Sequence, residues 1–141
     1  MKSRDKIIET LSSCSDIDDP DEYYDELVDF SKKSRKDDDF RFMLNILNAL
    51  GNMDRLLILH ALKKKDRCVC ELEAILNKTQ PAVSHHLKIL EKANLIHGWK
   101  KGKFTHYSLI NQTFRSFNKM WTEWNDEATN WFSTIFKVDS R

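Results

Sequence analysis

Glycine and proline are scarce in this chain, which has three glycines and two prolines among its 141 residues. Because these residues interrupt regular structure, their scarcity predicts a mainly helical protein with short turns. Cysteine is also rare, and two of the three cysteines are separated by one residue, so a secreted disulfide framework is implausible. No stretch approaches the roughly 18 uninterrupted apolar residues of a membrane helix, and the N-terminal residues have too short an apolar run for a secretory signal. We therefore expect a cytoplasmic protein without a membrane partner.

The sequence also lacks the residue groupings that many enzymes use. It contains no Gly-rich phosphate loop, no His-x-x-x-His pair and no Cys-x-x-Cys pair. His60, His97 and His106 are scattered along the chain, and His60 suits a surface or helix-end position better than a ligand role. These absences predict a protein that is not an enzyme.

Charge is unevenly distributed, although the formal net charge is only +1. Residues 1–40 contain 7 Lys and Arg against 13 Asp and Glu, a net charge of −6, whereas residues 41–141 contain 16 against 9, a net charge of +7. Within residues 77–106 there are six lysines and a single acid, Glu91. This asymmetry indicates a polyanion-binding body with an acidic arm, and a merely solvated basic face is the alternative.

The acidic N-terminal part contains a clear helix start. Acidic side chains surround Pro20 over residues 18–22, which suits the positive end of a helix. That helix is predicted to run to about residue 33, after a weaker helix over residues 6–12, and the polar run 34–39 is predicted to be a linker. We expect residues 1–37 to form an acidic arm with one or two helices, followed by a domain over residues 38–141.

Helical periodicity dominates the next part of the chain. Two apolar helices are predicted on either side of Gly51 and Asn52, which supply a stop signal. A short helix over residues 69–76 follows, then a turn over residues 77–79 and a helix from residue 80 to about residue 93. Two helices joined by such a short turn form a helix-turn-helix unit.

A β-hairpin is predicted directly after the helix-turn-helix. Residues 95–99 and 104–109 alternate partially around a turn that contains Gly102. A basic hairpin in this position is a wing. The predicted fold class is therefore mainly α, a winged helix-turn-helix with a two-stranded β-hairpin wing and an added C-terminal dimerisation helix.

The C-terminal helix, predicted over residues 112–136, carries an aromatic stripe. Its apolar residues are separated alternately by three and four positions, an a/d heptad pattern over three heptads. Such a stripe can pack on the chain's own body, but its length and aromatic character favour a homodimer. The predicted interface residues are Phe114, Phe117, Trp121, Trp124, Ala128, Trp131 and Ile135.

The second helix of the helix-turn-helix has two chemically distinct faces. At 100° per residue, Val83, Leu87 and Leu90 fall on one side, and His86 lies nearer to that apolar side, which favours a structural role for it. The opposite face carries groups that bind base edges and phosphates. The predicted DNA-binding residues are Thr79 at the N-cap, Gln80, Ser84, His85 and Lys88, together with Lys100, Lys101 and Lys103 at the wing tip, although an ordinary solvated turn would explain the wing lysines.

Residues 47–109 resemble the ArsR/SmtB family of winged-helix regulators. The matching segments are LNALGNMDRLLIL, CVCEL, TQPAVSHHLKILEKANLI and KKGKFTHYSL. One departure is Met53-Asp54, where the family usually has Pro-Thr, and we expect it to alter a helix start without altering the function. The resemblance implies a homodimer that is often a repressor, released when it senses a metal, a metalloid or an oxidant.

The resemblance also directs attention to Cys68 and Cys70, which occupy the position of the family's thiolate sensors. A helix N-terminus and Arg67 would lower the thiol pKa values. On a regular helix, residues two apart point about 200° away from each other, so chelation by both thiols requires a distorted first turn. With Cys14 from the arm, the metal-ligating set Cys14, Cys68 and Cys70 would suit As(III), Sb(III), Cd or Pb. Thiol oxidation and inert, packed cysteines are the alternatives.

Together these observations predict a homodimeric regulator that binds double-stranded DNA, with repression favoured over activation. Two other classes stay open, namely a winged-helix protein-interaction module and a ligand-independent architectural DNA binder. The operator, the regulated gene and the inducer are not encoded in any of these patterns.

Overall fold

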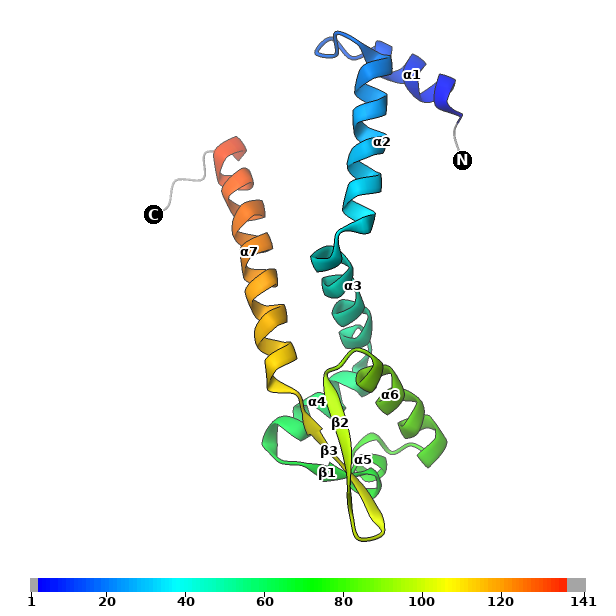
Figure 1. The fold of residues 1–141 in the computed structure, drawn as a ribbon, viewed down its shortest axis with the longest axis vertical. Coiled ribbons are helices and arrows are strands. Elements are labelled where there is room, and N and C mark those ends of the chain that lie inside the picture. The colour runs from blue at the N-terminus through cyan, green and yellow to red at the C-terminus, as the bar shows by residue number, and fades with distance from the viewer. Residues whose placement is uncertain (1–2, 137–141) are drawn as a thin grey trace. The chain divides into compact units, whose positions relative to one another are not determined.

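The computed structural model describes residues 3–136, with side chains described up to Asp126 in the last helix. These residues form helices and one small sheet (Figure 1), and the predicted winged helix-turn-helix fold is confirmed. The chain divides into two compact units, Met1–Arg41 and Phe42–Arg141. Within residues 3–136, no helix is long and apolar enough to cross a membrane.

The first unit contains α1 (Arg4–Ser12) and α2 (Pro20–Lys36). The carboxylate of Asp19 accepts hydrogen bonds from the backbone N–H groups of Asp21 and Glu22, so α2 begins where the acidic signature predicted. The predicted linker over residues 34–39 is wrong. Helix α2 continues to Lys36, and α3 begins at Asp38 because the Asp37 carboxylate caps it by accepting from the N–H of Phe40 at 2.8 Å.

Helices α3 (Asp38–Leu50) and α4 (Met53–Lys64) meet at the predicted stop. Gly51 follows the end of α3, and the side chain of Asn52 caps α4 by accepting from the N–H of Arg55. Helices α5 (Val69–Leu76) and α6 (Gln80–Lys92) follow, and α5 packs against both α4 and α6. The fully buried side chains at the centre of this core are Ile46, Ile58, Leu72, Val83, Leu87, Leu90, Leu95 and Ile96.

The wing is part of a three-stranded sheet. Strands β2 (Ile96–Lys101) and β3 (Phe104–Leu109) form the predicted antiparallel hairpin, and β1 (Arg67–Cys68) adds to the other side of β3 in the order β1-β3-β2. Sequence reasoning missed β1 because two residues are too short to show alternation. The register places Cys68 opposite His106, so the segment before α5 is attached to the wing.

Helix α7 (Asn111–Phe136) carries the predicted aromatic stripe. Phe114 and Phe117 pack against the core, so the beginning of the stripe covers the chain's own body. Trp121 stacks between Phe117 and Trp124, with ring centroids 6.0 and 5.5 Å away, and Trp124 is 45% exposed. The side chains of Ala128, Trp131 and Ile135 lie outside the described residues.

Candidate nucleic-acid interface

The turn between α5 and α6 depends on one asparagine. Asn77 ends α5 in the left-handed conformation, with φ of 51°, and therefore takes the place that glycine often has at this point. Thr79 occupies the N-cap position of α6, as predicted, but its hydroxyl makes no capping hydrogen bond. The Thr79 side chain is exposed, which leaves its hydroxyl available to an external partner.

The faces of α6 separate as the helical wheel predicted. Val83, Leu87 and Leu90 are buried, whereas Gln80, His85 and Lys88 are exposed and Ser84 is half-buried. Pro81 occupies the first turn, where its missing N–H costs no helical hydrogen bond. The exposed face thus presents an amide, an imidazole and an ammonium group along a single helix.

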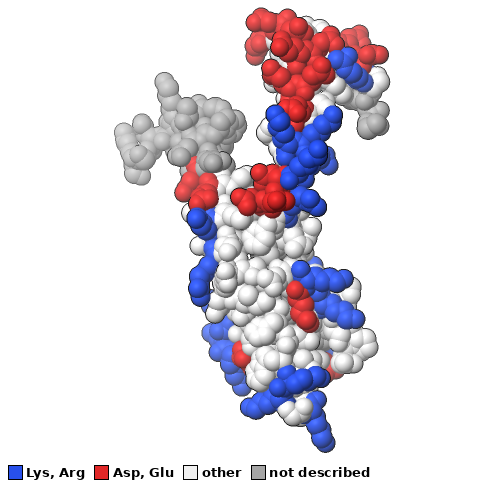
Figure 2. Space-filling view, viewed as in Figure 1, with Lys and Arg blue, Asp and Glu red and all other residues white. Residues whose placement is uncertain are grey.

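The wing tip concentrates positive charge. Lys100 and Lys101 end β2, Lys103 lies in the turn, and all three side chains are exposed. Gly102 has a φ of 62°, which a side chain would strain. Figure 2 shows Lys and Arg gathered over this end of the second unit, whereas Asp and Glu dominate the beginning of α2 in the first. Positive charge is therefore concentrated at the wing tip of the second unit, and negative charge at the beginning of α2 in the first unit.

His86 turns inward, as its wheel position indicated, and its side chain is 14% exposed. Its Nε2 lies 3.4 Å from Asp54 Oδ2 and its Nδ1 lies 3.4 Å from Arg55 Nη1. Burial is the main reason that the pKa of His86 lies below its ordinary value of 6.5, although Asp54 acts in the opposite direction. Sequence reasoning missed both partners, which could have been sought because a buried imidazole needs hydrogen-bond partners.

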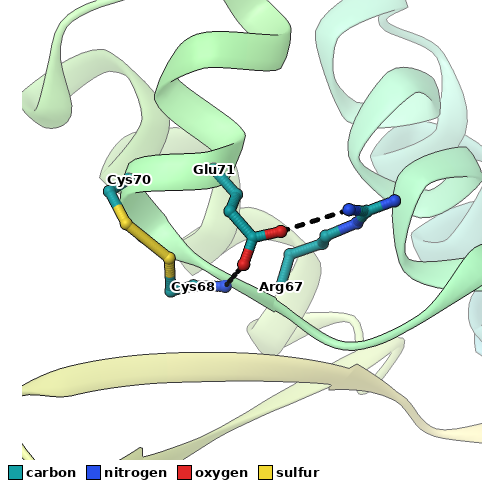
Figure 3. Close-up of a disulfide and its surroundings, with 4 residues drawn as sticks. All are labelled: Arg67, Cys68, Cys70 and Glu71. Atoms are coloured by element: carbon teal, nitrogen blue, oxygen red, sulfur yellow. Dashed lines mark hydrogen bonds and ion pairs between the residues drawn. A yellow bond between two sulfur atoms is a disulfide. The ribbon is translucent and has the colours of Figure 1, made fainter.

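Cys68 and Cys70 lie side by side and form a disulfide, with their Cα atoms 5.5 Å apart (Figure 3). The condition predicted for both thiols to meet, a departure from the regular first turn, is present. Cys68 is the extended N-cap residue at the end of β1, and only Cys70 lies within α5, so the helical rotation between them does not apply. Cys68 is buried and Cys70 is exposed, so the pair lies at the edge of the core.

Arg67, which precedes the cysteine pair, makes its direct contacts with other groups. Its Nη1 lies 3.1 Å from Glu71 Oε2, and its Nε donates to the carbonyl of Ala61. The other Glu71 oxygen accepts from the N–H of Cys68 (Figure 3). The hydrogen bond from Arg67 is the main reason that the pKa of Glu71 lies below its ordinary value. Through these two contacts, Glu71 links the first turn of α5 to both residues of β1.

Cys14 is exposed in the first unit, after the end of α1. Among the residues that the structure describes, no three His, Cys, Asp or Glu side chains are grouped as a metal site requires. Cys68 and Cys70 lie together within the second unit, and Cys14 belongs to the first.

Comparison with known proteins identifies relatives of this arrangement. Residues 52–97 match the family described as bacterial regulatory protein, arsR family. An uncharacterized HTH-type transcriptional regulator of Methanocaldococcus jannaschii is 36% identical over 76 residues, covering 53% of this chain and 85% of that protein. The arsenical resistance operon repressor of Bacillus subtilis is 44% identical over 62 residues, covering 43% of this chain and 59% of that repressor. Among solved structures, reduced HlyU from Vibrio cholerae N16961 superimposes with a TM-score of 0.51 and 26% identity, covering 67% of this chain and 90% of HlyU.

Proposed function

The chain belongs to the ArsR family of transcriptional regulators, which are not enzymes, and from this premise we propose that it is a homodimeric repressor that binds double-stranded DNA through α6 and the wing. The observation that carries the proposal is the separation of faces on α6. Hydrophobic side chains hold one face to the core, and the opposite face leaves Gln80, His85 and Lys88 exposed. A DNA-binding regulator acts at the chromosome, so we place it in the cytoplasm.

Each proposed contact has a chemical role. Gln80 can bond adenine through two hydrogen bonds in the major groove, and Ser84 and His85 can bond base edges or phosphates. Lys88 would neutralise a phosphate, and the Thr79 hydroxyl would donate a hydrogen bond at the leading end of the helix. Lys100, Lys101 and Lys103 extend the charged surface to flanking phosphates or a minor groove.

The homodimer is supported by apolar surface in the second unit. Trp124 is exposed beside the stacked ring of Trp121, and Leu44, Leu47, Met53, Leu56 and Leu57 are exposed on α3 and α4. A large exposed apolar patch marks an interaction site, and these five side chains gather on two consecutive helices. Two copies related by a two-fold axis would read an inverted repeat, with half-sites about 34 Å apart, one turn of DNA.

We assign the switch to Cys68 and Cys70, which fit a soft-ligand site because their sulfurs already meet. As thiolates, the two residues would hold As(III), Sb(III), Cd or Pb, and Cys14 is the candidate third ligand. In the redox form of the switch, peroxide takes two electrons and two protons from the two thiols, forming the disulfide and two water molecules. Either event acts at the first turn of α5, which packs against α6.

The test of DNA binding is a titration against a duplex selected from a random-sequence library by the wild-type protein, repeated over a range of salt concentrations. If each dimer neutralises roughly 6–10 phosphates, the logarithm of the binding constant falls against the logarithm of salt concentration with a slope of about −5 to −9. A slope near zero, or no enrichment of any sequence, would overturn the proposal.

The first unit favours a second candidate function, protein interaction. Tyr23, Leu27 and Phe30 form an exposed apolar stripe along α2, and Phe30 is 70% exposed. A partner bound there would remain bound after the wing lysines are removed, whereas DNA affinity would fall. A third candidate, an architectural DNA binder, predicts the same affinity whether the thiols are free, metallated or oxidised.

A further inference from the structure

A chain of polar contacts joins α6 to the beginning of α4. His86, on α6, lies between Asp54 and Arg55, at 3.4 Å from each. Lys78, in the turn before α6, lies 3.4 Å from the same Asp54 oxygen that faces His86. Asp54 therefore contacts two side chains of the helix-turn-helix, Lys78 in the turn and His86 in α6.

Arg55 continues the chain of contacts to the end of α3. Its Nε donates to the carbonyl of Ala49 at 2.6 Å, and its Nη2 donates to the carbonyl of Asn48 at 3.1 Å. These carbonyls belong to the last turn of a helix, where backbone acceptors lack intrahelical partners. Through Arg55 and His86, the end of α3 and the start of α4 are thus linked to α6.

The contacts determine which protonation state of His86 fits. An arginine can only donate, so His86 Nδ1 must accept from Arg55. Asp54 as a carboxylate can only accept, so Nε2 must carry the hydrogen that faces it. The neutral imidazole with its hydrogen on Nε2 satisfies both partners. A second proton, on Nδ1, would direct an N–H group at the N–H groups of Arg55.

We propose that neutral His86 is a positioning residue for DNA recognition, which holds α6 at the angle where His85 and Lys88 reach DNA and releases it on protonation. The proposal rests on the proposed DNA-binding function. It assigns to His86 a role that its neighbour cannot have, because His85 is exposed and faces outward.

The charges around His86 determine the direction of the effect. It faces Asp54 and Arg55 from α4, Lys78 from the turn and His85 from its own helix. Asp54 favours the charged imidazole, whereas Arg55, Lys78, His85 and above all burial disfavour it. If only the neutral form is positioned for DNA, binding releases a proton once the pH falls through the lowered pKa of His86, so affinity weakens with acid. His85 has the opposite effect, because its protonation adds a cation to the DNA-facing surface.

The experiment compares four full-length proteins at about pH 7.5 and about pH 5, above and well below the ordinary histidine pKa, because the pKa of His86 is lowered. The proteins are wild type, His86→Gln, His86→Leu and the matched control His85→Gln, and the probe is the duplex selected by the wild type at the higher pH. Gln retains an N–H donor and cannot titrate in this range, whereas Leu retains neither donor nor acceptor. Nuclear magnetic resonance titration of the histidine rings in the free wild-type protein provides a readout independent of DNA.

We expect acid to weaken the wild type several-fold relative to His86→Gln, approaching the roughly tenfold per pH unit that one linked proton gives below the His86 pKa. His85→Gln should weaken more steeply with acid than the wild type, and His86→Leu should bind poorly at both pH values. Identical pH profiles for wild type and His86→Gln would overturn the inference and leave the proposed function intact, as would a measured pKa of the His86 ring at or above the ordinary histidine value. Absence of DNA binding by the wild type at both pH values would overturn the inference and the proposed function together.

Discussion

The ring of Tyr107 lies against Gly98 on the neighbouring strand of the wing. The two residues are directly paired between β2 and β3, and a Cβ atom at residue 98 would lie 3.1 Å from Tyr107 Cε1 and 3.3 Å from Cζ. Burial, with a smaller contribution from Glu91 at the end of α6, raises the pKa of Tyr107. The absence of a side chain at Gly98 therefore lets Tyr107 connect the wing to α6.

Replacement of Gly98 by valine should move Tyr107, even though valine favours strands. We expect Gly98→Val to lower the free energy of unfolding by about 1–3 kcal/mol, the usual cost of overpacking. Urea denaturation measures this decrease. In the Tyr107→Ala background, the same substitution should cost much less, and an equal cost in both backgrounds would show that the ring is not the obstacle.

Removal of the wing lysines should weaken DNA binding because fewer phosphates are neutralised. The triple variant Lys100→Ala, Lys101→Ala, Lys103→Ala should make the salt dependence less steep by about 0.9 for each phosphate that a lysine no longer neutralises. A titration of the selected duplex over several salt concentrations measures the slope. The matched control is Lys63→Ala, Lys64→Ala, Lys65→Ala at the end of α4, which changes net charge equally. The same decrease in affinity and slope for both triple variants would mean that only net charge matters.

A charge placed in the aromatic stripe of α7 should dissociate the proposed homodimer. Trp124→Glu would bury a carboxylate without a partner in that interface, which costs several kcal/mol. Sedimentation should show monomers at concentrations where the wild type is dimeric. Thr122→Glu introduces the same side chain at a different, exposed face of α7 and should remain dimeric. Dimers of the Trp124 variant as stable as the wild type would exclude this stripe as the interface.

The thiol switch is tested by DNA titrations of the reduced protein with and without arsenite, cadmium and peroxide. We expect each agent to weaken wild-type binding at least about tenfold, a coupling of about 1.4 kcal/mol. The variant Cys68→Ser, Cys70→Ser should not respond. Cys14→Ser distinguishes the two forms of the switch, because removal of a third ligand weakens the arsenite response and leaves the peroxide response intact. Equal responses of wild type and double variant would eliminate the switch.

Glu71 should stabilise the protein in a pH-dependent way. Its pKa in the folded protein lies below the ordinary value of 4.5, so its contribution is present above that value and is lost as the pH falls through the folded pKa. Glu71→Gln should therefore lower the free energy of unfolding near neutral pH by about 0.5–1 kcal/mol, since the ion pair is partly solvated. The difference from wild type should vanish in acid. Glu73→Gln on the same helix provides the control, and a difference that persists unchanged in acid would contradict this account.

Local patterns in the sequence determined the helices, the α5–α6 unit, the wing and the outward face of α6. Each depends on neighbours within a few positions, such as the acidic cap of Asp19 or the apolar spacing of Val83, Leu87 and Leu90. The motifs in the same segments also indicated the family. These features could be predicted because 3.6-residue periodicity and capping are written in consecutive residues.

Tertiary structure alone decided which side chains meet. Cys68 reaches Cys70 because pairing of β1 with β3 keeps Cys68 in extended backbone outside α5. His86 contacts Arg55, which lies 31 positions earlier in the sequence, because α4 packs against α6 and brings the two side chains together. Contacts of this kind form between elements that are distant in sequence. Local periodicity does not predict which of these elements pack together. The sequence thus determined the exposed polar face of α6, and the packing of the helices decided which contacts hold α6 in place.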